Sequence, residues 1–219
     1  MSQKILVIGA AGKVGKRLVP LLVKAGHQPF AMHRRPEQSK ALENAGAVPV
    51  LANLAELSVE GLAALMEGMD AVVFSAGAGG ASIELINAID GEGLKRSVDA
   101  AHKAGVGRFL HVSAYPKSWR EEPYSKVFEH YFYVKKQTDI YVTESELDWV
   151  ILRPSTLSDE PGKGRIKAGL AVPYGIICRD DVAATLVVLT NMPKISRRII
   201  EMTDGDDVIS ESLQQFMNK

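Results

Sequence analysis

Three side chains in the middle of the chain have the types and spacing of a proton-transfer site. Tyr131 and Lys135 lie four residues apart, so they share one face of the helix expected over Val127 to Glu144. Ser113 follows an apolar run, at the expected end of a strand. A phenol has a reference pKa of about 10, so it needs a neighbouring cation before it exchanges protons readily near neutrality. The three residues are therefore candidate catalytic groups; the alternative is a chance pair on a helix whose aromatic side chains, such as Tyr133, serve packing.

The N-terminal segment could bind a dinucleotide. An apolar run that begins at Lys4 leads directly into Gly9, Gly12 and Gly15 and then into a helix. Gly9 would permit a tight turn, Gly12 would let the backbone approach a pyrophosphate, and Gly15 would let the helix pack on the strand. The free N–H groups at a helix N-terminus also attract phosphates. The expected contacts are Gly9, Ala10, Ala11, Gly12, Lys13 and Val14, and the alternative is an ordinary tight turn.

The residues after the second expected strand indicate which cofactor is bound. A site for NAD usually places an acidic residue there for the ribose hydroxyls, whereas a site for NADP places arginine near the added phosphate. This chain has His33, Arg34 and Arg35 and no carboxylate at that position. Guanidinium geometry matches a phosphate. We therefore expect NADP(H) to be preferred over NAD(H), with a solvated basic turn as the alternative.

Two further strand ends should line the same cleft. Asn53 and Leu54 follow the third expected strand, and an amide can both accept from an adenine amino group and donate to a ring nitrogen. Ser75, Ala76 and Gly77 follow the fourth, where small residues would let the backbone approach the ribose and nicotinamide.

Strand and helix patterns alternate along the chain. Strands are expected at Gln28 to Met32, Ala47 to Leu51, Asp70 to Ser75, Arg108 to Ser113, Trp149 to Leu152 and Arg198 to Met202, with strand-like pieces near Gly164 to Ala168 and Gly175 to Cys178. Helices are expected from Pro36 to near Gly46, from Ser58, over about Glu92 to Lys103, over Val127 to Glu144, over Asp180 to Thr190 and near Ser210 to Phe216. Pro20 should kink the first helix. The pattern predicts an α/β fold of the Rossmann type, a doubly wound parallel sheet with helices on both faces.

Composition favours one domain and excludes several kinds of partner. The chain has 219 residues, 46% of them hydrophobic, and a formal net charge of zero, which gives no general attraction to nucleic acid or an anionic membrane. Its apolar runs are shorter than the ~20 residues of a membrane span. Cys178 is the only cysteine, and the histidines show no metal-ligand spacing. We expect a single cytoplasmic domain over 1–219 that binds a small-molecule substrate, with no metal, nucleic-acid or membrane partner and no evident protein partner.

The order of these motifs resembles the atypical short-chain dehydrogenase/reductases that bind NAD(P)H. The resemblance covers nearly the whole chain and rests on Gly9 to Gly15, Ala104 to Phe109 leading into Val112 and Ser113, His130 and Tyr131 with Lys135, Asp148 to Pro154, and Arg179 to Ala183. The chain looks most similar to the small members that are sugar-epimerase-like, NADH-flavin or biliverdin-reductase-like, or NmrA-like.

The resemblance implies roles for the candidate residues. Tyr131 would be the acid/base, Lys135 would lower the pKa of that phenol and hold the nicotinamide ribose, and Ser113 would polarise a substrate carbonyl. Arg34 aligns best with the arginine that relatives carry after the second strand. Asn53 departs from an aspartate that often bonds adenine.

The resemblance also implies roles in the C-terminal part of the chain. Pro154 and Ser155 would border the nicotinamide, while Arg179 to Asp181 would cap a helix and be structural. A small substrate-side region is expected mainly over about 155–178. Walls of the pocket could come from Tyr115 to Arg120 and from Ser155 to Tyr174, which contains Lys163, Arg165 and Lys167.

These observations predict an NADPH-dependent oxidoreductase that reduces a small carbonyl, quinone or flavin-like acceptor. The alternatives are a non-catalytic NADP(H) sensor or regulator and a small epimerase-like enzyme. Tyr131 and Lys135 favour an enzyme, because related sensors generally lack that pair.

Overall fold

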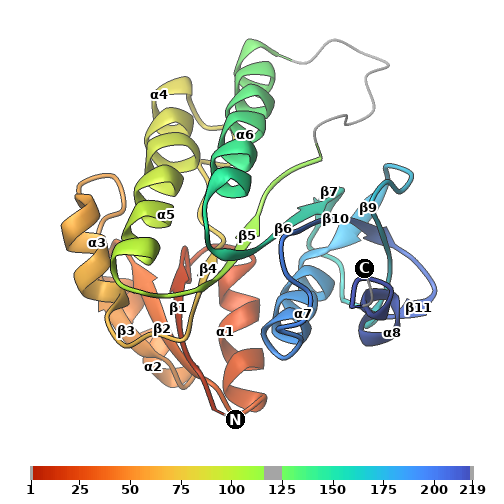
Figure 1. Cartoon of the computed structure of the whole chain (residues 1–219), viewed down its shortest axis with the longest axis horizontal. Helices are drawn as coiled ribbons and strands as arrows, with labels where there is room; N and C mark the ends of the chain where they lie inside the picture. Colours follow the sequence, from red (N-terminus) through yellow and green to blue (C-terminus); the bar gives the residue numbers. More distant parts are fainter. Residues whose placement is uncertain (1, 116–124, 218–219) are drawn as a thin grey trace.

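A central sheet of nine strands organises the computed structural model, which describes residues 2–115 and 125–217. The strands lie in the order β11-β8-β10-β6-β5-β4-β1-β2-β3 (Figure 1). Their bounds are β1 (Lys4–Ile8), β2 (Gln28–His33), β3 (Val48–Leu51), β4 (Ala71–Phe74), β5 (Arg108–Val112), β6 (Asp148–Pro154), β8 (Arg165–Gly169), β10 (Arg198–Asp204) and β11 (Asp207–Val208). A separate parallel pair joins β7 (Thr156–Ser158) to β9 (Ile176–Cys178).

The strand order confirms the doubly wound parallel sheet. β3, β2, β1, β4, β5, β6 and β10 pair in parallel, whereas β8 pairs antiparallel with β10 and β11 antiparallel with β8. The sheet is therefore mixed at its C-terminal edge, where the sequence predicts only parallel pairing. The order reverses between β1 and β4, and ligands of such sheets bind outside the carboxyl ends of the strands at this point.

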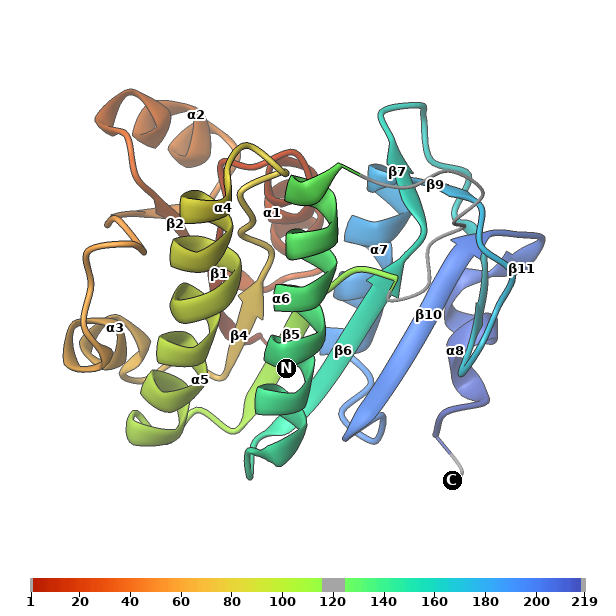
Figure 2. The same ribbon diagram turned by 90° about the horizontal axis from the view of Figure 1, so that it is seen from above.

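Helices cover both faces of the sheet. Their bounds are α1 (Gly15–Lys24), α2 (Ser39–Asn44), α3 (Val59–Met66), α4 (Ile83–Leu85), α5 (Leu94–Lys103), α6 (Lys126–Glu144), α7 (Arg179–Thr190) and α8 (Ile209–Gln214), with a 3₁₀ turn at Pro36–Gln38 and a π-helical stretch, η2, at Ile86–Gly93. α5 and α6 lie side by side in front of the sheet, with α1 and α7 behind it (Figure 2).

The β1 strand shows why a parallel sheet forms here. Ile5 and Val7 belong to the buried cluster under α1, α7 and α8, whereas Leu6 and Ile8 belong to the cluster under α3 and α5. Side chains alternate between the two faces of a strand, so a continuous apolar run is buried on both sides. β4 is likewise buried along its whole length.

Most predicted elements are confirmed within one to three residues, and the differences are specific. The helix expected from Glu92 begins earlier, because α4, η2 and α5 form one continuous helical segment from Ile83 to Lys103. Gly91 and Gly93 lower helix propensity there, which hides the segment in the sequence. β6 includes Arg153 and Pro154, which were expected to end it. Pro20 lies inside α1, as the sequence predicts. The short strands β7 and β11 were not predicted. Within the described residues, no helix is long and apolar enough to cross a membrane.

Arg108 connects three elements at the amino end of β5, the end away from the cavity. Its guanidinium pairs with Asp148 at 2.9 Å and donates to the backbone oxygens of Ile195 at 2.8 Å and Leu189 at 2.9 Å. Burial lowers the pKa of Arg108 and Asp148 opposes that shift. The side chain therefore ties β5 to β6 and to the end of α7.

Arg108→Met should lower the free energy of unfolding by about 2 to 4 kcal/mol, because the oxygen of Ile195 loses its guanidinium donor, that of Leu189 keeps only backbone donors, and Asp148 loses its cation. Denaturant unfolding measures this change. Asp148→Asn is the matched variant and should cost less, since Arg108 keeps both carbonyl contacts. Equal stabilities of Arg108→Met and the wild type would contradict the assigned role.

Candidate functional site

A cavity of about 600 Å³ lies at the carboxyl edge of the parallel strands. Its volume is within the range of about 300–1,000 Å³ usual for cofactor sites. Most of the residues predicted from the sequence line it: Gly9, Ala11, Gly12, Lys13, Val14, Arg34, Arg35, Asn53, Leu54, Ser75, Ala76, Gly77, Ser113, Tyr131 and Lys135. The structure thus brings together residues from five strand ends and from α6.

Three predicted residues, all in the described part of the chain, lie outside this lining. The side chain of Ala10 is buried in the core, and its N–H donates to the oxygen of Met32 at 3.2 Å. Pro154 is paired in β6, and Ser155 is buried with its hydroxyl 3.0 Å from that of Thr203. Their side chains pack the sheet beside the cavity.

The glycine turn has the geometry that its spacing predicts. Gly9 has φ +89°, which favours glycine, and a Cβ there would lie 2.6 Å from the nitrogen of Ala76. A Cβ on Gly15 would lie 2.3 Å from the oxygen of Gly9, so only glycine lets α1 pack this close to β1. A Cβ on Gly12 would meet the oxygen of Gly9 at 3.0 Å and nothing else within 4 Å. The turn leaves open space at Gly12, on the cavity side.

The two arginines after β2 differ in their surroundings. Arg35 pairs with Glu37 at 3.3 Å, whereas Arg34 has no carboxylate partner among the described residues. Both are exposed and line the cavity. Arg34 is therefore the guanidinium available to an anionic group at this end of the cavity.

Asn53 uses both ends of its amide within its own turn. Its Oδ1 accepts from the N–H of Ala55 at 3.2 Å, and its Nδ2 donates to Glu56 at 2.7 Å. An adenine contact by Asn53 requires these two local bonds to be exchanged.

Lys135 and Tyr131 lie on one face of α6 and reach the cavity, as their spacing predicts. The Nζ of Lys135 lies 5.7 Å from the centre of the Tyr131 ring and 3.0 Å from Oδ1 of Asp90. The side chains of Lys135 and Asp90 are 5% and 0% exposed, so this is a buried ion pair. Asp90 was not anticipated, because it lies in the unpredicted π-helical stretch.

The pKa of Tyr131 departs from the expectation. Burial raises it, Lys135 opposes the shift, and Asp90 and Asp139 add to it. Lys135 therefore acts in the expected direction, but the net effect is a phenol that stays protonated at neutral pH.

A second buried layer lies beneath these residues. Asp139 accepts from Arg153 at 2.8 and 2.9 Å and lies 3.6 Å from Nε2 of His111. Burial raises the pKa of Asp139, opposed by Ser113 and Arg153, and burial lowers the pKa of His111 far enough that its ring is neutral. The buried hydroxyl of Ser113 acts on Asp139, whose pKa it lowers, although it makes no hydrogen bond of ordinary geometry among the described residues.

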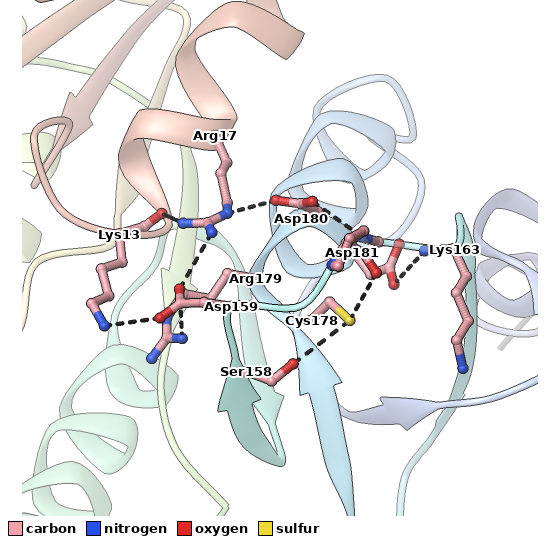
Figure 3. Close-up of polar contacts among 11 residues, drawn as sticks. Lys13, Arg17, Ser158, Asp159, Lys163, Cys178, Arg179, Asp180 and Asp181 are labelled. Carbon is pink, nitrogen blue, oxygen red and sulfur yellow. Dashed lines mark hydrogen bonds and ion pairs between the residues drawn. The ribbon is translucent and has the colours of Figure 1, made fainter.

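A group of ion pairs lies between the glycine turn and the start of α7 (Figure 3). Asp159 pairs with Arg179 at 2.9 Å, Lys13 at 3.0 Å and Arg17 at 3.3 Å. Lys13 and Arg179 also line the cavity. Asp159 therefore links the segment after β7 to the turn expected to hold a pyrophosphate.

The start of α7 divides into residues with different roles. Asp180 accepts from the N–H of Gly162, and Asp181 from those of Lys163 and Gly164 (Figure 3). These two aspartates bind the loop before β8, so the expected capping role is wrong: the N-cap residue of α7 is Cys178, without a side-chain cap. Arg179, assigned with them, lines the cavity instead. The sequence gave no signal that Arg179 lines the cavity, because it stands at the start of a helix beside two aspartates that bind the neighbouring loop.

The expected pocket walls are placed only in part. Leu157 reaches the cavity, but Lys163, Arg165 and Lys167 do not contribute to its described lining. Lys163 pairs with Asp204 at 2.7 Å instead. Tyr115 is buried and donates to the oxygen of Val172, and the rest of that loop, residues 116–124, lies outside the described residues.

Comparisons with known proteins show the family of the chain. Residues 9–193 match the model of the NAD(P)H-binding family, and the chain belongs to that family. YhfK of Bacillus subtilis, an uncharacterized sugar epimerase, is 38% identical over 97% of this chain and 100% of its own length. A solved structure from Bacillus halodurans, provisionally named an NAD-dependent epimerase/dehydratase, is 31% identical with a TM-score of 0.89, covering 98% of this chain and 100% of that one. The anaerobillin reductase ChuY of Escherichia coli O157:H7 shares the fold, with 23% identity, a TM-score of 0.77, and 93% and 98% covered.

The residues present fit a nicotinamide dinucleotide. The glycine turn and the cations Lys13, Arg34 and Arg179 suit a polyphosphate. The cavity continues from them to Tyr131 and Lys135.

Gly12→Val should weaken nicotinamide cofactor binding by at least about tenfold, since the side chain would press on the oxygen of Gly9 and fill the space at the turn. Calorimetric titration measures the affinity. Gly107→Val is the matched control, because a Cβ there meets nothing within 4 Å. A folded Gly12→Val protein with normal affinity would contradict the proposed turn.

Proposed function

We propose that the chain is an NADPH-dependent reductase of a small carbonyl, quinone or flavin-like acceptor, with the catalytic residues of a short-chain dehydrogenase/reductase. The observation that carries the proposal is the convergence of Ser113, Tyr131 and Lys135 on the cavity that also contains the glycine turn. NADPH, when bound, supplies the hydride.

The chain's own residues supply the proton and the orientation. Hydride addition to a carbonyl carbon leaves negative charge on the oxygen, and the hydroxyl of Tyr131 can donate its proton there. The hydroxyl of Ser113, which lines the cavity, can donate a hydrogen bond to the same oxygen in place of Asp139. Lys135, fixed by Asp90, can hold a ribose hydroxyl beside them.

The lining of the cavity supports a small, largely apolar acceptor. Leu85, Ile89 and Leu157 contribute apolar side chains to it. ChuY is named as a reductase of anaerobillin, so anaerobillin belongs in the panel of acceptors to be tested beside simple carbonyls, quinones and flavins.

Spectrophotometric screening of NADPH oxidation against this panel tests the proposal. Turnover of any acceptor supports a reductase. Tight NADPH binding without turnover of any of them would instead favour the sensor, and interconversion of a sugar substrate would favour the epimerase-like enzyme.

NADPH should bind more tightly than NADH by about tenfold to a hundredfold, because an arginine pairs with the additional phosphate. Arg34→Ala should remove most of this preference. Arg35→Ala is the matched control and should matter less, since Glu37 already pairs with Arg35. Calorimetry with both cofactors measures the effect, and equal wild-type affinities would refute it.

Tyr131→Phe should distinguish two kinds of acceptor. With a carbonyl, the rate should fall by about 10²- to 10⁴-fold while NADPH affinity stays nearly unchanged, because proton donation is lost. With a flavin-like ring, solvent can protonate another atom, so the rate should change little. Lys135→Ala should weaken NADPH binding in both cases. Normal binding and turnover by Lys135→Ala would mean that the pair has no role at the site.

A further inference from the structure

The cavity end that contains Tyr131 holds an unusual number of buried charges. Lys135 and Asp90 form one buried pair, and Asp139 and Arg153 form a second pair next to it. The two cations balance the two carboxylates, while His111 is neutral. Taking charges out of water is costly, so each cation depends on its carboxylate.

Asp90 is held in place by the backbone around it. Its side chain is fully buried, and its Oδ2 accepts from the N–H of Ala78 at 2.8 Å. A Cβ on Gly77 would lie 3.1 Å from its Oδ1, so the loop after β4 packs directly against the carboxylate. The carboxylate cannot turn away from Lys135 without losing these contacts.

Asp90 acts on the protonation of both neighbours in the same direction. Burial alone would lower the pKa of Lys135, but Asp90, with Tyr131 and Asp139, raises it above its ordinary value. Burial raises the pKa of Tyr131, and the negative charge of Asp90 adds to that shift. A carboxylate favours the ammonium and disfavours the phenolate, so both groups keep their protons.

The other groups that face the pair do not reverse this balance. Asp139 on α6 and Tyr174 before β9 also raise the pKa of Tyr131, whereas Lys135 lowers it. Arg153 on β6 is paired with Asp139, and His111 on β5 carries no charge. Asp90 is therefore the nearest negative charge to the ammonium of Lys135.

We propose that Asp90 is a positioning residue that holds the Tyr131–Lys135 pair fully protonated, so that the site donates a proton to its substrate and does not withdraw one. This inference rests on the proposed function of Tyr131 as the acid/base. Reduction of a carbonyl consumes a proton at the new hydroxyl oxygen, which Tyr131 supplies. Oxidation of an alcohol, the first step of epimerase-type chemistry, must instead begin by removing that proton. The buried carboxylate thus favours reduction over alcohol oxidation at neutral pH.

Asp90→Asn tests the proposal, because it removes the charge and keeps an oxygen for the N–H of Ala78. The two groups titrate as a coupled pair, so the measured quantity is the pH at which the pair first loses a proton. That pH should fall by about one to three units. It is read as the alkaline limb of kcat/KM for carbonyl reduction, and as tyrosinate absorbance in the difference between each protein and its Tyr131→Phe counterpart. Alcohol oxidation should correspondingly begin at lower pH.

Asp148→Asn is the matched control, because it removes the carboxylate of another largely buried cation, Arg108, away from the cavity. It should leave both profiles unchanged. If Asp90→Asn does not fold, the same measurements are made on Asp90→Ser, whose smaller side chain also has an acceptor oxygen and no charge. An alkaline limb in Asp90→Asn that coincides with the wild type would overturn the proposal, as would tyrosinate from Tyr131 at neutral pH in the wild type.

The tyrosinate titration and the activity of Tyr131→Phe together distinguish a failure of this inference from a failure of the proposed function. If Tyr131→Phe reduces carbonyls normally, Tyr131 is not the acid and its role in the proposed function fails, whatever the titration shows. If Tyr131→Phe abolishes reduction but Asp90→Asn leaves the tyrosinate titration unchanged, the function stands and the role of Asp90 fails.

Discussion

The site depends on the backbone contact between the end of β1 and the start of α1. A side chain at Gly15 would overlap the oxygen of Gly9, and one at Gly9 would overlap the backbone of Ala76 after β4. Three elements therefore meet at van der Waals distance in one turn. Because the strand order reverses at this place, the same contact opens the crevice in which the cavity lies. The cavity residues at the other strand ends are positioned by strands that register on β1 and β4, whereas Asp90, Tyr131 and Lys135 lie on helices in front of the sheet.

Two of the carboxylates that pair with cations of this cavity, Asp159 and Asp90, differ in their surroundings. Asp159 is half exposed and forms ion pairs with Lys13, Arg17 and Arg179. Ion pairs in contact with water are weak and screened by salt, so an incoming phosphate can replace Asp159. Asp90 is sealed from solvent and has no such competitor. One end of the cavity thus has exchangeable charges and the other has fixed ones.

Local signals predicted the fold and most of the cavity. Apolar strands, the glycine spacing, and the four-residue interval from Tyr131 to Lys135 each act within a few residues, and each is found as expected. What the sequence did not show depends on packing between distant segments. Asp90 belongs to a helical stretch whose glycines lower the helix propensity, so the sequence did not predict it. Arg179 is oriented by its ion pair with Asp159. Burial has a larger effect on the pKa of Tyr131 than Lys135 has. The antiparallel pairing of β8, a strand that the sequence did predict, and the two-residue strand β11 were equally hidden.

The position of Asp90 at the site depends on the number of residues in the π-helical stretch Ile86–Gly93. A π turn closes one residue later than an α turn, so this stretch has the backbone form of a single-residue insertion in an ordinary helix. Deleting one residue between Asp90 and Leu94 would restore regular α geometry and carry Asp90 about 100° around the helix axis. The ammonium of Lys135 would then lose its carboxylate although no residue of the cavity had been substituted. On the proposed role of Asp90, a one-residue deletion here would therefore change the pH range over which the site donates a proton.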